Sequence, residues 1–299
     1  MIAGIEAGGT KFVCAVAHDP QTILEEIRFP TTTPEETIGK AVNFFMEMQE
    51  VHGDISSLGV GTFGPIDPDP KSPTYGYITS TPKPHWDNID IVGILKEALH
   101  VPIGFDTDVN GAALGEYMWG AGRGLDVVLY ITIGTGVGGG VVINGRPLHG
   151  LTHPEMGHIA IAGTDGSDSF RGSCPYHGDC LEGLVSGPAI QAREGRPGQD
   201  IAEDDPVWDK IAGYIAQALC TYIYVLSPQK IILGGGVLSQ HHLLPRVQSL
   251  VPDFLNGYVR KDAVSTAGIS GYIVTPGLGT KSGVIGAFAL GMQAAGMLP

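Results

Sequence analysis

Apolar and polar positions follow two patterns along this chain, which together indicate a mixed α/β protein. Residues 2–7, 12–17 and 22–29 form short apolar or alternating runs, as β-strands do. The first two runs flank the turn Ala7-Gly-Gly-Thr-Lys11, which predicts a hairpin. Thr33-Pro-Glu-Glu36 combines an N-cap residue, a proline at the first helical position and a capping-box glutamate, so a helix is expected to begin there.

The rest of the first part of the chain continues this alternation of strands and helices. The first helix carries an apolar stripe made of Ile38, Ala41, Val42, Phe45 and Met46. After it the pattern predicts a strand at 58–63, a Pro-rich loop at 65–84, a helix at 91–99, a strand at 102–105 and a helix from about 110 to 119. The order is therefore βββαβα.

The second part of the chain follows a similar order of strands and helices, although its sequence does not resemble that of the first part. It begins with a hairpin of strands 126–133 and 139–143 around Gly134-Thr-Gly-Val-Gly138. A polar, glycine-rich insertion at 150–185 is followed by two helical stretches, a strand at 230–233, a helix, a strand at 272–275 and a last helix from about Ser282. We therefore expect two α/β domains, residues 1–118 and 119–299, with a cleft between them and with the last helix able to pack back on the first.

Composition narrows the class of protein. The 299 residues suit two domains, and 17 basic against 31 acidic residues give a net charge of −14, which argues against nucleic acid or an anionic membrane as partner. No signal-peptide pattern opens the chain, and its four cysteines are too few for a disulfide scaffold, so a cytoplasmic location is expected. The longest apolar stretch, 211–226, is interrupted by Gln217 and Thr221 and predicts a buried helix rather than a membrane span.

Three glycine clusters are candidates for holding a phosphorylated ligand. The spacing at 134–138 imitates a dinucleotide fingerprint, but the chain continues into a strand rather than a helix, so that interpretation fails, as does a Walker loop. Two hairpin tips remain, whose N–H groups and threonine hydroxyls can clamp a polyphosphate, although ligand-free tight turns would look the same. The third cluster follows a strand and permits close approach of a flat group such as adenine. The candidates are Gly8, Gly9, Thr10, Lys11, Gly134, Thr135, Gly136, Gly234, Gly235 and Gly236.

Six motifs in this order are together highly specific. They are Glu6-Ala-Gly-Gly-Thr-Lys11, Asp108-Val-Asn110, Ile133-Gly-Thr-Gly136, His153-Pro-Glu-Met-Gly-His158, the segment from Cys174 to Glu182, and Leu233-Gly-Gly-Gly-Val237. Over nearly its whole length the chain resembles the ROK family of bacterial sugar kinases, and its fructokinases most. The resemblance implies the two-domain actin-like (ribonuclease H-like) fold, with ATP and sugar meeting in the cleft. Family repressors carry an added N-terminal helix-turn-helix, and because no such segment precedes the first phosphate-loop strand in this acidic sequence, a repressor is not expected.

Phosphoryl transfer needs a base beside the attacking hydroxyl, and Asp108 is the candidate. It follows a strand and precedes a helix whose expected cap is Asn110, so the positive end of the helix should keep the carboxylate ionised. The resemblance implies that this aspartate takes the proton of the sugar hydroxyl. Asp106 is the rival carboxylate, with a capping role as its alternative.

The resemblance also implies which side chains hold the sugar. Glu155, His158 and Glu182 would hydrogen-bond its hydroxyls, although Glu155 alone would suit a surface position and His158 alone a core position. Thr107 and Gly64 are assigned to the same site. Many family glucokinases have asparagine where this chain has Thr107, which favours another hexose. Glu6 replaces the family's usual aspartate, so magnesium or phosphate positioning near Lys11 is expected to differ slightly.

A metal site is expected at His158, Cys174, His177 and Cys180, since two thiolates and two imidazoles suit a structural zinc ion. The usual family pattern has three cysteines, and here Pro175 stands at the second while His177 can substitute for it. A Cys174–Cys180 disulfide or two free thiols are the alternatives. Cys14 and Cys220 lie in apolar contexts and are predicted to be core residues.

These expectations lead to an ATP-dependent hexose kinase, with Mg²⁺ accompanying ATP, that converts D-fructose to fructose 6-phosphate. A mannokinase, a manno(fructo)kinase, a glucokinase or a sugar-sensing regulator without turnover are the alternatives, and the last conflicts with the presence of Asp108 and both phosphate loops. Members of the family are often dimers, so the resemblance also suggests a homodimer.

Three further expectations concern single segments and side chains. The segment Thr81-Pro-Lys-Pro-His-Trp86 is a candidate lid over the sugar. His241 and His242 are expected to be solvated, and Trp86, Trp119 and Trp208 are expected to pack in the interior.

Overall fold

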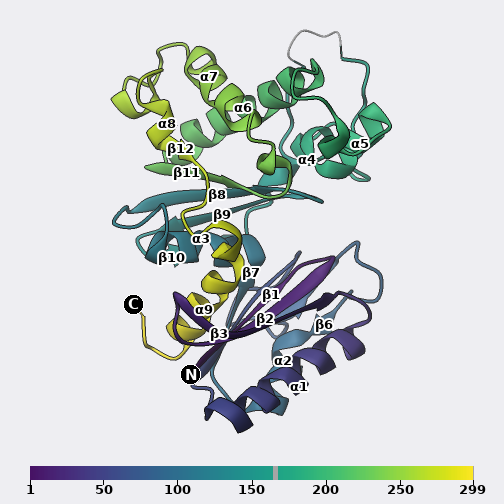
Figure 1. Cartoon of the computed structure of the whole chain (residues 1–299), viewed down its shortest axis with the longest axis vertical. Coiled ribbons are helices and arrows are strands. Elements are labelled where there is room, and N and C mark those ends of the chain that lie inside the picture. Colours follow the sequence, from purple (N-terminus) through teal and green to yellow (C-terminus); the bar gives the residue numbers. More distant parts are fainter. Residues whose placement is uncertain (164–167, 299) are drawn as a thin grey trace. The chain divides into compact units, whose positions relative to one another are not determined.

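The structure, a computed structural model, describes residues 1–163 and 168–298, so four residues of the insertion at 150–185 lie outside it (Figure 1). The expected α/β class is confirmed, because two five-stranded sheets are each accompanied by helices. Contacts divide the chain into two units. Unit 1 comprises Met1–Asp126, Gly140–Pro154 and Gly277–Pro299, and unit 2 comprises Val127–Gly139 and Glu155–Pro276. A single boundary at residue 118 stays a prediction.

The sheet of unit 1 has the strand order β3-β2-β1-β4-β7. Neighbours β1, β2 and β3 are antiparallel, whereas β1, β4 and β7 run parallel, as expected for two hairpins followed by helical crossovers. Its strands are β1 (Ile2–Ala7), β2 (Lys11–Asp19), β3 (Thr22–Pro30), β4 (Ser57–Thr62) and β7 (Ile103–Thr107). Its helices are α1 (Pro34–His52), α2 (Ile91–Leu99), α3 (Asp108–Trp119) and α9 (Ser282–Ala294), and the Pro-rich loop adds the small pair β5 (Tyr77–Ile78) and β6 (Ile89–Asp90).

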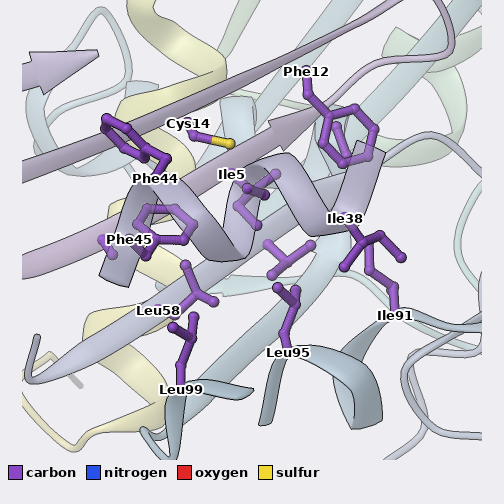
Figure 2. Close-up of a cluster of buried hydrophobic side chains, with 14 of the residues drawn as sticks. Ile5, Phe12, Cys14, Ile38, Phe44, Phe45, Leu58, Ile91, Leu95 and Leu99 are labelled. Atoms are coloured by element: carbon purple, nitrogen blue, oxygen red, sulfur yellow. The ribbon is translucent and has the colours of Figure 1, made fainter. Parts of the chain in front are cut away.

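Alternate residues of the strands face opposite layers, as a pleated strand requires. In β2, Phe12 and Cys14 belong to the cluster that α1 and α2 cover, whereas Val13 lies in the cluster with α9. Figure 2 shows Ile5 and Leu58 of the sheet among the side chains of α1 and α2. The core of unit 1 therefore lies on both faces of one sheet.

Helix α1 begins where the sequence predicts, because the Thr33 side chain accepts a hydrogen bond from the N–H of Glu36 and Pro34 opens the helix. Its buried stripe differs from the expected one. Met46 is 51% exposed, while Phe44 and Met48 are buried beside Phe45. The stripe is thus rotated toward Phe44 and Met48.

Helix α9 lies very close to the sheet of unit 1 at a glycine. A Cβ atom at Gly59 in β4 would fall 1.6 Å from the carbonyl oxygen of Ala287, so any side chain there would push the helix away. The last helix of the chain therefore belongs to the first unit.

The second sheet has the order β10-β9-β8-β11-β12, in which β8, β11 and β12 are parallel. Its strands are β8 (Val127–Ile133), β9 (Val137–Ile143), β10 (Arg146–Pro147), β11 (Lys230–Gly234) and β12 (Ile273–Val274). The helices of unit 2 are α4 (Leu181–Val185), α5 (Gly187–Glu194), α6 (Val207–Leu226), α7 (Leu243–Leu255) and α8 (Ile269–Tyr272). The predicted apolar stretch at 211–226 is part of α6, whose residues from Ile211 to Ala216 are all buried. In the described chain no helix combines the length and apolar character needed to span a membrane.

Several packing expectations can be compared with the structure. Trp86 and Trp208 are fully buried, Trp119 is half-buried, and Cys14 and Cys220 are buried, all as predicted. The prediction of a solvated His242 is wrong, because its ring packs edge-on against Trp208 with centroids 5.0 Å apart. Both of its ring nitrogens are buried without a hydrogen-bond partner, and burial lowers its pKa.

Candidate functional site

The first glycine turn joins β1 to β2 and is closed by a hydrogen bond from Gly8 N to Lys11 O of 2.9 Å. The residue that follows β3 holds this turn in place. Thr31 donates through its hydroxyl to Gly8 O at 2.6 Å and through its N–H to Thr10 O at 3.0 Å. Thr10 and Lys11 are exposed, so the turn presents a hydroxyl and an ammonium group to solvent.

Glu6, the last but one residue of β1, lies close to this turn. Burial raises the pKa of its carboxyl group, and the positive charge of Lys11 opposes that shift. A Cβ atom at Gly283 would lie 2.4 Å from the carboxyl carbon of Glu6, which places the carboxyl group against the first turn of α9. The carboxyl group of Glu6, at the position where the resemblance implies aspartate, therefore lies beside the start of α9.

Asp108 is the first residue of α3 and is half-buried. The cap of this helix is Thr107, whose hydroxyl oxygen accepts a 3.1 Å hydrogen bond from Asn110 N, so the expected capping by Asn110 is wrong. The strand runs two residues further than predicted, which shifts the start of the helix. Asp108 Oδ1 accepts from Val109 N at 2.9 Å, and the helix N-terminus favours the ionised carboxylate.

Asp106, the rival carboxylate, is held inside the protein. It is 2% exposed, and its Oδ1 accepts hydrogen bonds from Thr107 N at 2.8 Å and Asn110 Nδ2 at 2.7 Å. Its Oδ2 pairs with His149 Nε2 at 2.9 Å. The hydrogen bond to Asp106 raises the pKa of His149, although burial opposes this. The arrangement supports a structural role for Asp106.

Sequence reasoning missed two histidines of unit 1. His149 lies outside every motif, and nothing in its local sequence indicates a buried partner. His153 opens a motif, but its role follows only from the fold, because its Nε2 accepts a 3.1 Å hydrogen bond from Ile66 N. Its ring also lies against Gly64, where a Cβ atom would be 3.2 Å from Cε1. His153 thereby fixes the turn that contains Gly64.

The second glycine turn joins β8 to β9 in unit 2, and Gly134 N donates to Gly136 O at 2.8 Å. Glu182 of α4 lies beside it, because its Oε2 accepts a 2.9 Å hydrogen bond from Val137 N. The start of α5 also meets the turn, where Gly187 N donates to Gly134 O at 2.7 Å. A residue predicted for the sugar and a predicted phosphate loop are therefore neighbours.

The third glycine cluster is adjacent to the same turn. Gly235 has φ +94°, and a Cβ atom there would lie 2.3 Å from Ile133 O, so only glycine fits. A Cβ atom on Gly134 would lie 3.8 Å from Gly236 N. Gly235 and Gly236 are exposed, which leaves their backbone accessible to a ligand.

Glu155 and His158 flank a single tight turn, one of the two geometries that their spacing predicts. Glu155 precedes a 3₁₀ helix at Met156–His158, which His158 ends, and His158 N donates to Glu155 O at 3.1 Å. Helix α6 holds this turn, because the hydroxyl of its Tyr222 donates to Met156 O at 2.6 Å. Glu155 is exposed and His158 is half-buried.

The structure brings the four predicted metal ligands together. Their ligand atoms all lie within 4.8 Å of one another. Cys174 Sγ lies 3.8 Å from His158 Nδ1 and 3.7 Å from His177 Nδ1, and Cys180 Sγ lies 3.6 Å from His158 Nδ1. Around tetrahedral zinc, with bonds of about 2.3 Å to sulfur and about 2.0 Å to nitrogen, such atoms are about 3.5 Å apart. The donor set and its spacing fit that ion.

Both cysteines of this cluster are free thiols, so the structure does not contain the alternative disulfide. Burial raises the pKa of the Cys180 thiol to about 11. A metal ion would have to displace that proton, which makes metal binding pH-dependent.

Comparisons with known proteins agree with this architecture. Residues 2–294 match the model of the ROK family. A fructokinase from Zymomonas mobilis is 47% identical over 97% of this chain and 96% of its own length, and one from Streptococcus mutans is 44% identical over 99% and 98%. The crystal structure of a ROK family glucokinase from Streptomyces griseus, in complex with glucose and AMPPNP, superposes with a TM-score of 0.77 at 25% identity, covering 98% of this chain and 99% of that one. The fold is therefore that of the two-domain actin-like sugar kinases, and this chain belongs to the ROK family.

Proposed function

We propose that this protein is an ATP-dependent hexose kinase that converts D-fructose to fructose 6-phosphate. One observation carries the proposal: relatives named fructokinases share 44–47% of residues along almost the entire chain. The geometry is compatible with it, because a carboxylate begins a helix in unit 1 and glycine turns with accessible backbone occur in both units.

Asp108 is the proposed base. It accepts the proton of the fructose 6-hydroxyl while that oxygen forms a bond to the terminal phosphorus of ATP, and the bond from this phosphorus to the bridging oxygen breaks to release ADP. The N-terminus of α3 keeps the carboxylate ionised and ready to accept the proton. Asp106 is a positioning residue in this account, because Asn110 and His149 occupy its oxygens.

The glycine turns are proposed to hold the nucleotide. N–H groups and hydroxyls of residues 8–11 and 134–136 would bind phosphate oxygens, and the exposed backbone of Gly235 and Gly236 would lie against the adenosine. Mg²⁺ bound to the phosphates would neutralise part of their charge. Glu6 is a carboxylate close enough to the first turn to interact with Lys11, and it would orient this end of the nucleotide complex.

The sugar contacts are proposed for Glu155, His158, Glu182, Thr107 and Gly64. His158 can serve the sugar and a metal together, because its Nδ1 faces both cysteine sulfurs and leaves Nε2 for a hydroxyl. Thr107 is 3% exposed and its oxygen caps α3, so its contribution is a short hydroxyl held in place by the helix.

The cluster of His158, Cys174, His177 and Cys180 is proposed to bind structural zinc. Cys180 immediately precedes α4, which carries Glu182, so the ion would brace the segment that presents two of the proposed sugar ligands. The ion takes no part in the chemical step. A cytoplasmic homodimer stays a prediction from the sequence.

The test is an assay of ATP consumption with fructose, with the product identified as fructose 6-phosphate. Asp108→Asn should bind fructose with near-normal affinity and lose roughly 10²–10⁴ in kcat, the usual contribution of a positioned base. Asp87→Asn, an exposed aspartate of the same unit, is the matched control. Near-normal turnover in Asp108→Asn would remove this residue from the mechanism, and a wild-type protein inactive with fructose would refute the function.

A further inference from the structure

The segment 81–86 is firmly attached to unit 1 through one tryptophan. Trp86 is fully buried, and its ring centroid lies 5.5 Å from that of Phe12 and 5.4 Å from that of Phe63. The indole Nε1 of Trp86 donates to Thr32 O at 2.8 Å, and the backbone N–H of Trp86 donates to Lys83 O at 3.2 Å. The segment is therefore an anchored turn, and the position of Lys83 is set by the core.

The residue before Thr32 connects this turn to the first glycine turn. Thr31 is 6% exposed and binds the glycine turn twice, at Gly8 O and at Thr10 O. Thr31 therefore holds the glycine turn, while the next residue, Thr32, accepts the hydrogen bond that anchors Trp86.

Lys83 also contacts Thr31. Its Nζ donates to Thr31 O at 3.1 Å, so the ammonium group lies next to the residue that is hydrogen-bonded to the glycine turn. The side chain is half-buried, and among the residues the structure describes it has no carboxylate within ion-pair distance. An ammonium group has three N–H bonds, of which this carbonyl accepts one. In a chain of net charge −14, a half-buried cation without a carboxylate is poised to bind an anion.

We propose that Lys83 binds the terminal phosphate of ATP beside the first glycine turn and stabilises the phosphoryl group as it is transferred to the hexose. This inference rests on the proposed kinase function. The Thr31 carbonyl orients the ammonium group, so its charge is in place before reaction and needs no rearrangement. Lys83 belongs to the segment 81–86, so the segment that was expected to act as a lid would supply a phosphate ligand.

The physical effect follows from the charge of the transferred group. Negative charge spreads over the three outer oxygens of the phosphoryl group during transfer, and a fixed cation lowers the energy of that state more than that of bound ATP, whereas ADP lacks the terminal phosphate. Lys83 neither gains nor loses a proton in this role. Removing the charge should therefore affect turnover and ATP binding, while ADP binding changes little.

The experiment compares Lys83→Met, which removes the charged end of the side chain and keeps an unbranched apolar stem, with Lys83→Arg, which keeps its charge. Lys71→Met, an exposed lysine in the same Pro-rich loop, is the control. Kinetics with fructose should show kcat lower by about 100-fold in Lys83→Met, a partial recovery in Lys83→Arg, and a KM for fructose within about threefold of the wild type. Calorimetry should show weaker binding of a non-hydrolysable ATP analogue and nearly unchanged binding of ADP.

Two results would overturn the inference. The first is turnover and analogue affinity in Lys83→Met equal to those of Lys71→Met. The second is an equal loss of affinity for ADP and the analogue together with a lower melting temperature, which would make Lys83 a structural brace of the loop. If the wild type fails to phosphorylate fructose, the proposed function fails, whereas the comparison of analogue and ADP affinities still decides the role of Lys83.

Discussion

Asp106 and Asp108 stand two positions apart in the sequence, yet they have different physical environments. Asp106 belongs to β7, is almost fully buried and has both oxygens engaged by Asn110, Thr107 and His149. Asp108 opens α3, where the helix N-terminus favours a carboxylate and where the side chain is half-buried. Spacing alone cannot separate them, because a strand would direct both to one face. The transition from strand to helix at Thr107 makes the difference.

The pair of Asp106 and His149 predicts a pH dependence of stability. The hydrogen bond to Asp106 raises the pKa of His149 above its ordinary value of 6.5, so the pair stabilises the fold fully below pH 6.5. This contribution is lost as pH rises from 6.5 through the folded pKa, because the unfolded chain has already released that proton. The free energy of unfolding, measured in urea, should therefore fall with rising pH more steeply in the wild type than in His149→Gln.

The exposed His241 provides the control for this measurement, since His241→Gln should follow the wild-type curve. Parallel curves for the wild type and His149→Gln across this pH range would contradict the assigned ion pair.

The residue scale also shows where sequence reasoning succeeds. Thr33 and Pro34 predicted the start of α1 correctly, because a cap and a proline act on their own backbone neighbours. Asn110 was an equally good cap residue by type, but the buried oxygen of Asp106 accepts its side-chain amide. His242 looked polar and solvated, and only the fold brings Trp208 against its ring. Helix starts can be predicted from neighbouring residues, whereas contacts between residues far apart in the chain cannot.

At the scale of elements, Glu116 holds α3 to the segment that leads into α9. It is fully buried and accepts four hydrogen bonds, from Ala121 N and Gly277 N at Oε2 and from Leu278 N and the Ser282 hydroxyl at Oε1. No sequence motif marked this residue. A glutamate within a helix has no local signal for donors more than 160 residues away in the chain.

Glu116→Gln should lower the free energy of unfolding by about 3 kcal/mol, because an amide NH₂ would face backbone N–H donors and leave them unsatisfied. Urea unfolding of the variant measures the loss. Glu97→Gln, at an exposed position on α2, should change stability by about 0.5 kcal/mol at most. Equal stabilities of the two variants would show that the four hydrogen bonds contribute little.

The metal cluster is a second case at the scale of elements. The spacing Cys174-x-x-His177-x-x-Cys180 was readable because all three ligands lie in one turn. His158 is 16 residues from Cys174, and it was included as a more distant histidine that completes a set of two thiolates and two imidazoles rather than by local spacing. The structure then supplies the evidence of geometry, with sulfur and nitrogen separations close to those around zinc.

Purified protein should contain about one zinc ion per chain, as measured by elemental mass spectrometry. Cys180→Ser should lose the ion and melt at a lower temperature, because metal binding contributes directly to the stability of the folded loop. Cys220→Ala, a buried cysteine of α6 outside the cluster, should retain it. A fully active preparation free of metal would contradict the bracing role.

At the scale of the whole molecule, the hydrophobic pattern predicted most elements and both hairpins. It allowed the last helix to pack back on the first domain, but it gave no indication that Gly140–Pro154 would group with unit 1. Helix α9 is apolar on nearly all sides, so its sequence does not reveal which sheet it covers. The close approach at Gly59, where no side chain fits, is what joins it to β4. Such complementarity between distant surfaces cannot be read from periodicity.

The most direct test of the whole account is the ratio of kcat/KM values for fructose, mannose and glucose with ATP. In the proposed site Thr107 would offer a short hydroxyl where many family glucokinases carry an amide, so glucose would lose a hydrogen-bonding partner. The account predicts fructose 6-phosphate as product and a kcat/KM for fructose at least about tenfold above that for either other sugar. A preference for glucose or mannose, or no ATP consumption with any of the three, would contradict it.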